Sequence, residues 1–148
     1  MLPDPIHLLC PRCGVANRLP AARLAESPRC GACKAKLFDG HPVALDDAAF
    51  RNHLRGDDVP LLVDFWATWC GPCRMMAPEF ERAASLLEPQ LRLAKVDIDA
   101  APALAAELGV QSVPTLALFV RGREVARRSG AMPARQIAAW ATDAAAQG

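Results

Sequence analysis

The sequence of 148 residues lacks both a long apolar run and a marked excess of charge of one sign. No stretch approaches the roughly 20 apolar residues that a transmembrane helix needs. Residues 1–5 carry no basic charge and precede no long apolar segment, so we expect no secretory signal. The 17 lysines and arginines nearly balance the 16 aspartates and glutamates, which argues against binding nucleic acids or membranes through charge alone. We therefore expect a cytoplasmic protein with neither of these partners.

All six cysteines fall into three pairs with the spacing Cys-x-x-Cys. Six cysteines in a chain of this length would otherwise be typical of a secreted protein held by disulfides. Because no export signal precedes them, we expect metal binding and redox catalysis in a reducing cytosol. With 52% hydrophobic residues, the chain is long enough for one domain of about 100 residues and a small appendage.

The first two pairs have the spacing of a zinc ribbon. Sixteen residues separate Cys10 and Cys13 from Cys30 and Cys33. Four thiolates meet the tetrahedral preference of zinc, and the glycines after Cys13 and Cys30 allow tight turns that aim backbone N–H groups at sulfur. A segment this short cannot bury enough apolar surface to fold alone, so the metal would supply its folding energy. We therefore predict a module over residues 1–36 with one structural zinc.

Residues 37–41 are predicted to be a linker. Within it, Leu37 and Phe38 either dock against one of the two units or cover a simple hinge, and we favour the hinge. His7 and His41 are possible metal ligands by residue type. Because four cysteines already complete the site, we expect both histidines to be ordinary surface residues.

The third pair, Cys70 and Cys73, follows an apolar run over residues 61–66 and begins a predicted helix. Two cysteines at this spacing face each other across one helical turn, which suits a reversible disulfide. Backbone N–H groups and the positive end of the helix dipole favour a thiolate at the first sulfur. Pro72 fits the first turn because an N–H there has no partner to lose. Trp69 offers an apolar surface to another polypeptide, so we predict dithiol–disulfide exchange on protein substrates.

The two thiols are expected to act in sequence. Cys70 precedes the helix and should be the more exposed, so its thiolate would attack a substrate disulfide. Cys73 would then attack the sulfur of Cys70 and release the reduced substrate. A structural disulfide or half of a metal site is the alternative, and the flanking sequence argues against it.

Residues 42–148 are predicted to form an α/β domain. We expect strands at 42–44, 61–66, 91–97, 115–120 and 124–128, and helices at 46–55, 71–88, 102–108 and from 133 onward. This order implies a mixed sheet with helices on both faces. Asp64 is a charged residue within an apolar strand, where burial would raise the pKa of its carboxyl group towards neutrality. The alternative is an aspartate at a strand edge that faces water.

Five landmarks in this domain together resemble the thioredoxin family, over roughly residues 41–148. They are Val63-Asp64-Phe65-Trp66-Ala67, Trp69-Cys70-Gly71-Pro72-Cys73, Lys95, Val113-Pro114-Thr115 and Ser129-Gly130-Ala131. The resemblance implies the thioredoxin fold. The cysteine spacing of residues 1–36 resembles the N-terminal zinc module of the thioredoxin-2 subgroup.

The resemblance also implies roles for single residues. Asp64 would help to deprotonate Cys73, with Lys95 as the partner of this aspartate. Pro114 would be cis and lie beside the cysteines, while the backbone of Val113 pairs with the substrate; a proline that merely starts a strand is the alternative. The implied substrate surface comprises Trp69, Gly71, Pro72, Val113, Pro114, Gly130 and Ala131.

The implied function is that of a monomeric, cytoplasmic thioredoxin that reduces protein disulfides in electron transport and redox homeostasis. We find no flavin or nicotinamide motif, so the electrons must come from a partner, which the resemblance implies to be NADPH-linked thioredoxin reductase. One rival is a zinc-ribbon interaction or redox-sensing module on a thioredoxin scaffold, which the intact Cys70 and Cys73 argue against. A second rival is an oxidising enzyme of an export compartment, but Gly71 and Pro72 resemble the reducing members.

Overall fold

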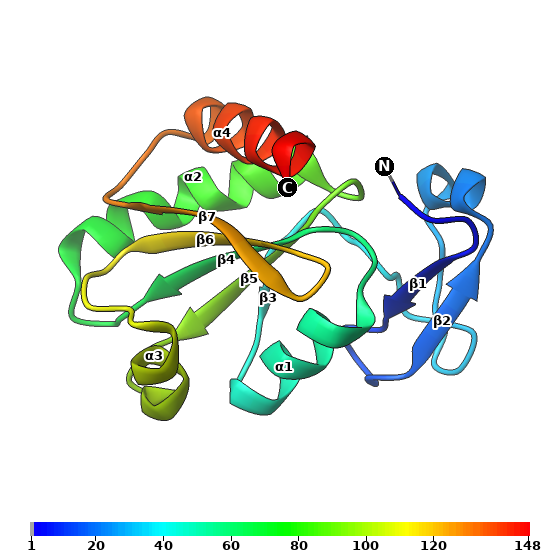
Figure 1. Ribbon diagram of the computed structural model, residues 1–148, viewed down its shortest axis with the longest axis horizontal. Helices are drawn as coiled ribbons and strands as arrows, with labels where there is room; N and C mark the ends of the chain where they lie inside the picture. Colours follow the sequence, from blue (N-terminus) through cyan, green and yellow to red (C-terminus); the bar gives the residue numbers. More distant parts are fainter. Residues whose placement is uncertain (1) are drawn as a thin grey trace.

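The computed structural model describes residues 2–148, which contain a two-stranded sheet and a five-stranded sheet (Figure 1). The elements in chain order are β1 (Ile6–Leu9), β2 (Ala16–Leu19), the 3-10 helix η1 (Ala21–Glu26), β3 (Val43–Ala44), α1 (Asp47–Gly56), β4 (Leu61–Trp66), α2 (Gly71–Leu87), β5 (Arg92–Asp97), α3 (Pro102–Leu108), β6 (Thr115–Val120), β7 (Arg123–Ser129) and α4 (Ala134–Gln147).

The five-stranded sheet has the strand order β3-β5-β4-β6-β7. β3 and β4 run parallel to β5, whereas β6 runs antiparallel to β4 and β7. Figure 1 shows α2 and α4 on one side of this sheet and α1 and α3 on the other. The predicted mixed sheet with helices on both faces is therefore confirmed.

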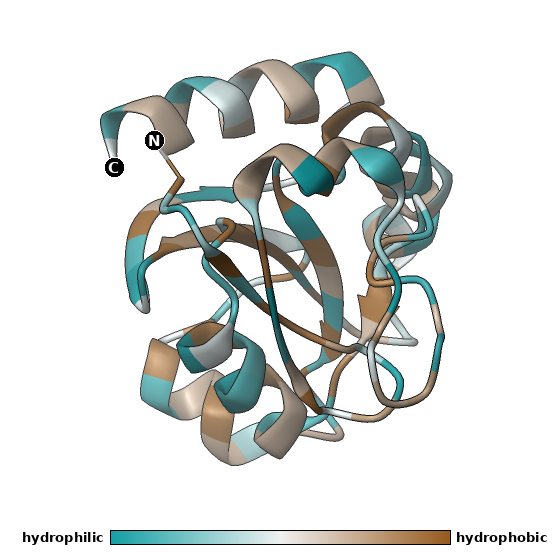
Figure 2. Ribbon diagram, turned by 90° about the vertical axis from the view of Figure 1, so that its right-hand side faces the viewer, coloured by the Kyte–Doolittle hydropathy of each residue, from teal (hydrophilic) through white to brown (hydrophobic). Residues whose placement is uncertain are grey.

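The central strand β4 is apolar on both faces because both faces are covered. Leu62 packs in the cluster formed with α2 and α4, whereas Val63 and Phe65 pack in the cluster formed with α1 and α3. Phe50 of α1 lies edge-on to Phe65, with the ring centroids 6.2 Å apart. Figure 2 shows the helices with bands of both hydropathy colours, as expected where one face meets a core and the other meets water.

Local signals in the sequence explain where several elements begin and end. The side chain of Asp46 caps α1 by accepting a hydrogen bond of 2.8 Å from the N–H of Ala49. α3 ends at Gly109, whose φ of 67° favours glycine. β7 is longer than predicted because its pairing with β6 continues to Ser129, opposite Thr115. Within residues 2–148, no helix is both long and apolar enough to cross a membrane.

The N-terminal module has an apolar cluster of its own, to which Ile6, Leu8 and Leu24 contribute. Leu37 also belongs to this cluster, is 0% exposed, and donates its N–H to the carbonyl oxygen of Pro28 over 3.0 Å. The expectation of a simple hinge is therefore wrong at Leu37, because burying this side chain is more favourable than leaving it in water.

Arg92, the first residue of β5, joins the module to the larger sheet from a position that is 2% exposed. Its guanidinium group donates to Asp57 over 2.8 Å and to the carbonyl oxygens of Leu37 and Leu9 over 2.9 and 3.1 Å. Asp57 also accepts the N–H of Leu9 over 2.9 Å and lies 2.7 Å from Nδ1 of His53. Although burial opposes it, the hydrogen bond with His53 and the charge of Arg92 hold the pKa of Asp57 below its usual value.

Close backbone packing completes this junction. A Cβ atom on Gly56 would lie 2.6 Å from Cγ of Leu9, so only glycine permits this approach. The N–H of His7 donates to Asp58 over 2.6 Å, and the N–H of Asp58 donates to the carbonyl oxygen of His7 over 2.9 Å. The module therefore packs near the N-terminal ends of β4 and β5, whereas Cys70 follows the C-terminal end of β4.

Candidate active site and metal centre

The sulfurs of Cys70 and Cys73 form a disulfide where the chain passes from β4 into α2. Cys70 is the residue before the helix, Cys73 lies in its first turn, and their Cα atoms are 5.2 Å apart. Their exposed fractions are 4% and 3%, because both pack in a small cluster with Ala67 and Val113. Both cysteines are thus buried in this oxidised state, and the exposed fraction of Cys70 exceeds that of Cys73 by too little to single out the attacking sulfur.

The start of α2 provides an electrostatic environment that favours negative charge on Cys70. The backbone N–H of Cys73 donates to Sγ of Cys70 over 3.1 Å. Pro72 lies in the first turn of the helix, where its missing N–H costs no hydrogen bond. After reduction, this N–H and the positive end of the helix dipole would stabilise a thiolate at Cys70.

Asp64 is the one charged residue of β4 and is 0% exposed. Neither carboxyl oxygen has a hydrogen-bond partner among residues 2–148. Burial raises the pKa of Asp64 to about 7, and the positive charge of Lys95 offsets only part of this rise. Because Asp64 lies two residues after Leu62, it shares the sheet face that α2 covers. The alternative of an aspartate that faces water is excluded.

Lys95 lies opposite Asp64 in the parallel pairing of β4 with β5. Its ammonium group lies 4.9 Å from the centroid of the Trp66 ring, within the range of a cation–π interaction. Since Asp64 has no hydrogen-bond partner among residues 2–148, Lys95 acts on it through its charge alone. The structure thus brings the two residues into one neighbourhood.

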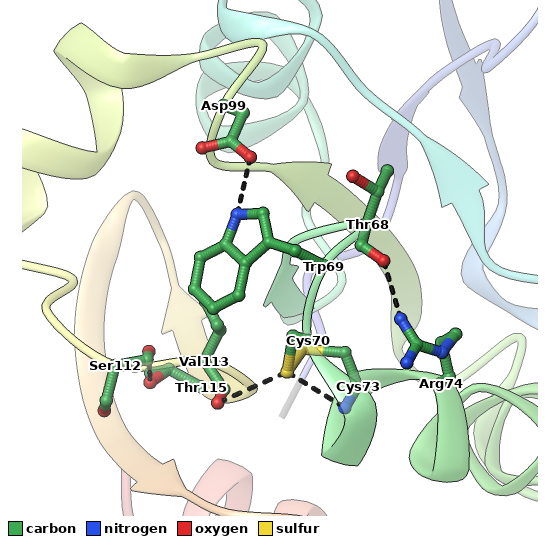
Figure 3. Close-up of a disulfide and its surroundings, with 9 residues drawn as sticks. All are labelled: Thr68, Trp69, Cys70, Cys73, Arg74, Asp99, Ser112, Val113 and Thr115. Carbon is green, nitrogen blue, oxygen red and sulfur yellow. Dashed lines mark hydrogen bonds between the residues drawn. A yellow bond between two sulfur atoms is a disulfide. The ribbon is translucent and has the colours of Figure 1, made fainter.

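The loop before β6 lies against the disulfide. The carbonyl oxygen of Val113 is 3.6 Å from Sγ of Cys70 (Figure 3). The Val113–Pro114 peptide bond is cis. The N–H of Gly130 donates to the carbonyl oxygen of Pro114 over 3.0 Å. Gly130 has a φ of 97°, which side chains other than that of glycine rarely allow. Two loops far apart in sequence therefore lie together beside Cys70.

Three hydroxyl groups brace these two loops. The hydroxyl of Thr115 donates to the carbonyl oxygen of Ser112 over 2.7 Å and lies 3.2 Å from that of Ser129. The hydroxyls of Ser112 and Ser129 are 3.3 Å apart. Sequence reasoning did not identify this contact, which fixes the turn before Val113 against the end of β7.

The predicted substrate surface is partly exposed and partly supporting. The Trp69 side chain is 66% exposed and donates its indole N–H to Asp99 over 2.9 Å (Figure 3). Among the other predicted members, Pro72, Gly130 and Ala131 are exposed, Gly71 and Val113 are half-buried, and Pro114 is buried. Pro114 therefore shapes this surface without presenting much of it to a partner.

Two exposed residues that follow Cys73 in α2, Arg74 and Met75, were not identified from the sequence. Met75 is 74% exposed, whereas its neighbour Met76 is buried in the core. Arg74 donates from its side chain to the carbonyl oxygen of Thr68 over 2.8 Å, across the loop that carries the tryptophan. A large apolar residue outside the apolar stripe of an amphipathic helix was the available signal for Met75.

The sulfurs of Cys10, Cys13, Cys30 and Cys33 converge, although they come from two separate turns. All four lie within 4.8 Å of one another, and the pairs Cys10–Cys33 and Cys13–Cys30 are each 3.6 Å apart. A tetrahedron of sulfurs at the usual Zn–S distance has edges of about 3.8 Å. The donor set and its spacing therefore fit a four-thiolate zinc centre.

Backbone N–H groups surround these sulfurs. The N–H groups of Arg12 and Cys13 each donate to Cys10 over 3.4 Å, and that of Ala32 donates to Cys30 over 3.4 Å. Such bonds stabilise thiolates, which are the metal-binding form. His7 and His41 contribute no ligand atom to this cluster, and both are exposed.

The predicted tight turns are present in both cysteine pairs, over residues 11–13 and 31–33, but only the first is followed by a glycine with a positive φ. The predicted glycine turn after Cys13 is present, because Gly14 has a φ of 78°. In the second turn the positive φ, 68°, is at Lys34, after the second cysteine, and not at Gly31. The two turns are thus alike in backbone geometry, because Gly14 and Lys34 hold equivalent positions after Cys13 and Cys33.

Comparison with known proteins agrees with this geometry. The family model described as Thioredoxin matches residues 41–143, and the one described as Thioredoxin 2, N-terminal, matches residues 9–35. A protein from Corynebacterium nephridii named Thioredoxin C-3 is 42% identical over 133 residues, which are 90% of this chain and 91% of that protein.

Two further proteins extend the comparison. The crystal structure of chloroplastic thioredoxin z superposes with a TM-score of 0.66 at 29% identity, covering 72% of this chain and 96% of that one. The bifunctional thioredoxin reductase/thioredoxin of Mycobacterium leprae is 47% identical over 92 residues, which are 62% of this chain and 20% of that protein. The five-stranded sheet and its helices thus have the thioredoxin fold.

Proposed function

The chain belongs to the thioredoxin family of protein-disulfide oxidoreductases, and we propose that it reduces protein disulfides through Cys70 and Cys73. The observation that carries this proposal is the disulfide at the start of α2, next to an exposed tryptophan, on a helix that covers the sheet face of a buried carboxyl group. The family model covers residues 41–143, so the proposed catalytic unit is 42–148. Residues 1–36 would be the zinc module, and residues 37–41 the linker.

The proposed cycle starts from the reduced pair. The Cys70 thiolate attacks one sulfur of a substrate disulfide, and the other sulfur leaves as a thiolate that takes a proton. Cys73 then attacks Sγ of Cys70, which forms the intramolecular disulfide and releases the second substrate sulfur. The substrate thus gains two electrons and two protons, and Cys70 and Cys73 lose them. The backbone N–H at 3.1 Å favours Cys70 as the first nucleophile.

Asp64 is proposed to accept the proton of Cys73 before the second step. With a pKa of about 7, set by burial, its carboxyl group exchanges protons near neutral pH. Lys95 is proposed to keep this pKa from rising further, because a positive charge favours the carboxylate. Both roles are supported by the lack, within residues 2–148, of any hydrogen-bond partner that would hold Asp64 permanently ionised.

The proposed substrate surface surrounds the disulfide. Trp69 and Met75 present large apolar side chains to solvent, which suits contact with another polypeptide. The backbone of Val113 lies next to Cys70, where it would pair with an extended substrate segment. The remaining proposed contacts are Gly71, Pro72, Pro114, Gly130 and Ala131.

The proposed electron donor is an NADPH-linked thioredoxin reductase. This is supported by the relative from Mycobacterium leprae, whose name joins a thioredoxin reductase with a thioredoxin in one chain. We further propose that the chain works as a monomer in the cytoplasm, in electron transport and redox homeostasis. One zinc held by Cys10, Cys13, Cys30 and Cys33 would fix the fold of the module, and it takes no part in the sulfur exchange.

The test is reduction of insulin by the full chain, supplied with thioredoxin reductase and NADPH. We expect steady NADPH oxidation that requires both the reductase and this chain. The same protein should also accelerate the reduction of insulin with dithiothreitol as donor, which removes the reductase from the assay. Activity of the protein with dithiothreitol but not with thioredoxin reductase and NADPH would contradict the proposed donor. No activity in either assay from folded protein would favour the scaffold function instead.

A further inference from the structure

A groove of about 650 Å³ lies between the zinc module and the edge of the larger sheet, away from the catalytic pair. Its wall on the module side carries the side chains of Arg12, Arg29 and Lys36, all of which are exposed. Within residues 2–148, the side chains of Arg12 and Lys36 form no hydrogen bond or ion pair. Arg29 donates to the carbonyl oxygen of Lys34 over 3.0 Å and keeps its charge. The disulfide chemistry uses none of these cations.

The positive charge of the groove reflects an uneven distribution along the chain. Residues 1–36 contain six lysines and arginines against two acidic residues, whereas residues 37–148 contain 11 against 14. One zinc held by four thiolates would add a formal charge of about −2 to the module, which would keep a net charge of about +2 beside an anionic domain. In the groove, the carboxyl group of Glu88 accepts the N–H groups of Gly40 and Leu93 over 3.2 and 3.0 Å, and burial raises its pKa to about 7. Asp39 is the other carboxyl group in the lining.

The floor of the groove suits an extended polypeptide. It includes β3, an edge strand whose outer side pairs with no other strand in the described part of the chain. The half-buried Phe38 lies beside it, with its ring held 4.3 Å from the guanidinium carbon of Arg92. An added strand would hydrogen-bond to the free edge of β3 while its acidic side chains meet the cations of the module. A nucleic acid has no peptide groups to offer to β3, and its phosphates would meet Asp39.

We propose that this groove binds an acidic, extended segment of protein substrates and so selects them for reduction. The proposal rests on the proposed disulfide reduction and adds a substrate class to it. Arg92, in the groove, lies opposite the first residue of β4, and Cys70 follows the end of that strand. Six strand residues span about 20 Å. A substrate that reaches both places therefore needs at least about six extended residues between its acidic segment and its disulfide.

The first measurement is direct binding, without turnover. A fluorescent peptide of about eight residues, rich in glutamate, is titrated with the oxidised, zinc-loaded full chain, and its anisotropy is recorded. We expect the double variant Arg12→Glu/Lys36→Glu to weaken binding about tenfold or more, and added salt to weaken binding to the unaltered chain. Arg18→Glu/Arg23→Glu is the matched control, because Arg18 and Arg23 are exposed cations of the same module outside the groove. It should change the Kd less than about twofold.

The second measurement is kinetic. One disulfide peptide carries the acidic segment beyond a linker of about eight residues, and its partner peptide carries serines there. The acidic peptide should have a KM about tenfold lower at equal kcat, and the double variant should abolish this difference. Turnover of a small aromatic disulfide should be the same in all variants. This last reaction reports the proposed reductase function, so its failure is distinguishable from failure of the groove.

Several outcomes would overturn the proposal. Equal losses in Arg12→Glu/Lys36→Glu and in Arg18→Glu/Arg23→Glu would show attraction to the overall charge of the module. Unchanged binding in the double variant would show that the groove is not the site, and tighter binding of a single-stranded oligonucleotide of equal charge would show the wrong partner. Should the double variant lose zinc, Lys36→Glu alone provides the test. Its side chain lies outside the turns that hold the four cysteines, and we expect about a threefold weaker Kd.

Discussion

The same spacing, Cys-x-x-Cys, builds two different sites in this molecule. At the start of α2, the two cysteines of one pair are bonded to each other. In the module, the shortest distances join cysteines of different pairs, 3.6 Å between Cys10 and Cys33 and between Cys13 and Cys30. The difference arises from the structure after each pair, a helix in one case and a tight turn in the other. The spacing thus brings sulfurs together, and the next element decides which sulfurs meet.

The surroundings of the two sites also differ, in how they stabilise negative charge on sulfur. Around the module cysteines, backbone N–H groups stabilise negative charge on several sulfurs at once. The hydrogen bond from the N–H of Cys33 is the largest effect on Cys30, and the pKa of this thiol is lowered to about 6. Despite a backbone hydrogen bond with Val15, burial and the neighbouring thiols raise the pKa of Cys13 to about 12, so the four sulfurs are not equally ionised without a cation. The catalytic pair has one such N–H and a buried carboxyl group on the sheet face that α2 covers.

Replacing single cysteines by serine should distinguish the catalytic pair from the zinc module most clearly. Cys70→Ser should lower insulin reduction by roughly a thousandfold or more, because the attacking sulfur is gone. Cys73→Ser should trap substrates as mixed disulfides, which are detected by mass spectrometry, because the resolving step is lost. Cys13→Ser, in the module, should retain turnover. Trapping by Cys70→Ser with normal turnover of Cys73→Ser would reverse the assignment.

Removing the metal should affect the zinc module and leave the catalytic pair unchanged. Peroxide oxidises thiolates, so it should release one zinc per chain and unfold residues 1–36, whose folding depends on the metal. We expect insulin reduction, measured on the same samples after re-reduction, to stay within about twofold. A chromogenic chelator follows the release. Activity that falls in step with zinc and does not return with reductant would show that the metal also supports the catalytic unit.

Asp64→Asn should act on the catalytic pair in a way that depends on pH. Below a pH of about 3.8 the carboxyl group is protonated in both the folded and the unfolded state, so it costs no stability. Between about pH 3.8 and about pH 7 the unfolded protein is ionised while the folded protein keeps the proton, so stability falls as the pH rises, and the loss is complete above about pH 7. At pH 8 the variant should therefore be more stable, by at most about 4 kcal/mol.

Urea unfolding of the oxidised protein at pH 5 and pH 8 measures this difference. The exposed residue Asp143 provides a control, since Asp143→Asn should change neither value. Turnover of Asp64→Asn at pH 7 should fall about a hundredfold, because the proton acceptor is missing. Unchanged stability and unchanged turnover would contradict the role proposed for this residue.

Lys95→Met should have the smallest effect, and its direction is informative. Removing a positive charge disfavours the carboxylate, so the pKa of Asp64 should rise above about 7. The pH profile of insulin reduction should shift upward by about one pH unit or less. A downward shift would mean that Lys95 does not act on Asp64 through its charge.

Much of this comparison could be predicted from the sequence, because local patterns determine it. The run of apolar residues locates β4, and the Gly109 signal ends α3. The convergence of four cysteines agrees with their spacing. The brace between Ser112 and Ser129 and the burial of Leu37 were not predictable, because they depend on segments that are distant along the chain. The burial of both Cys70 and Cys73 was not predicted, because it depends on Val113, 43 residues after Cys70.

The cationic module was also missed, for a different reason. The net charge of the whole chain is close to zero because the positive charge of residues 1–36 and the negative charge of residues 37–148 nearly cancel. Met75 was overlooked because its helix was analysed for its apolar stripe, and this residue lies outside the stripe. Both signals are local, and both emerge when each predicted unit is considered separately.

The contacts of Arg92 affect the design of truncated and chimaeric forms of this protein. The order of the units along the chain suggests that the zinc module can be removed. The guanidinium group of Arg92, however, donates to the carbonyl oxygens of Leu9 and Leu37, which lie before and after the four cysteines. A truncation before residue 41 would leave a formerly buried cation facing water and an uncovered apolar surface at Val59. Truncated forms should therefore carry compensating substitutions at Arg92 and Val59. Chimaeras with relatives that lack the zinc module should exchange β5 together with that module.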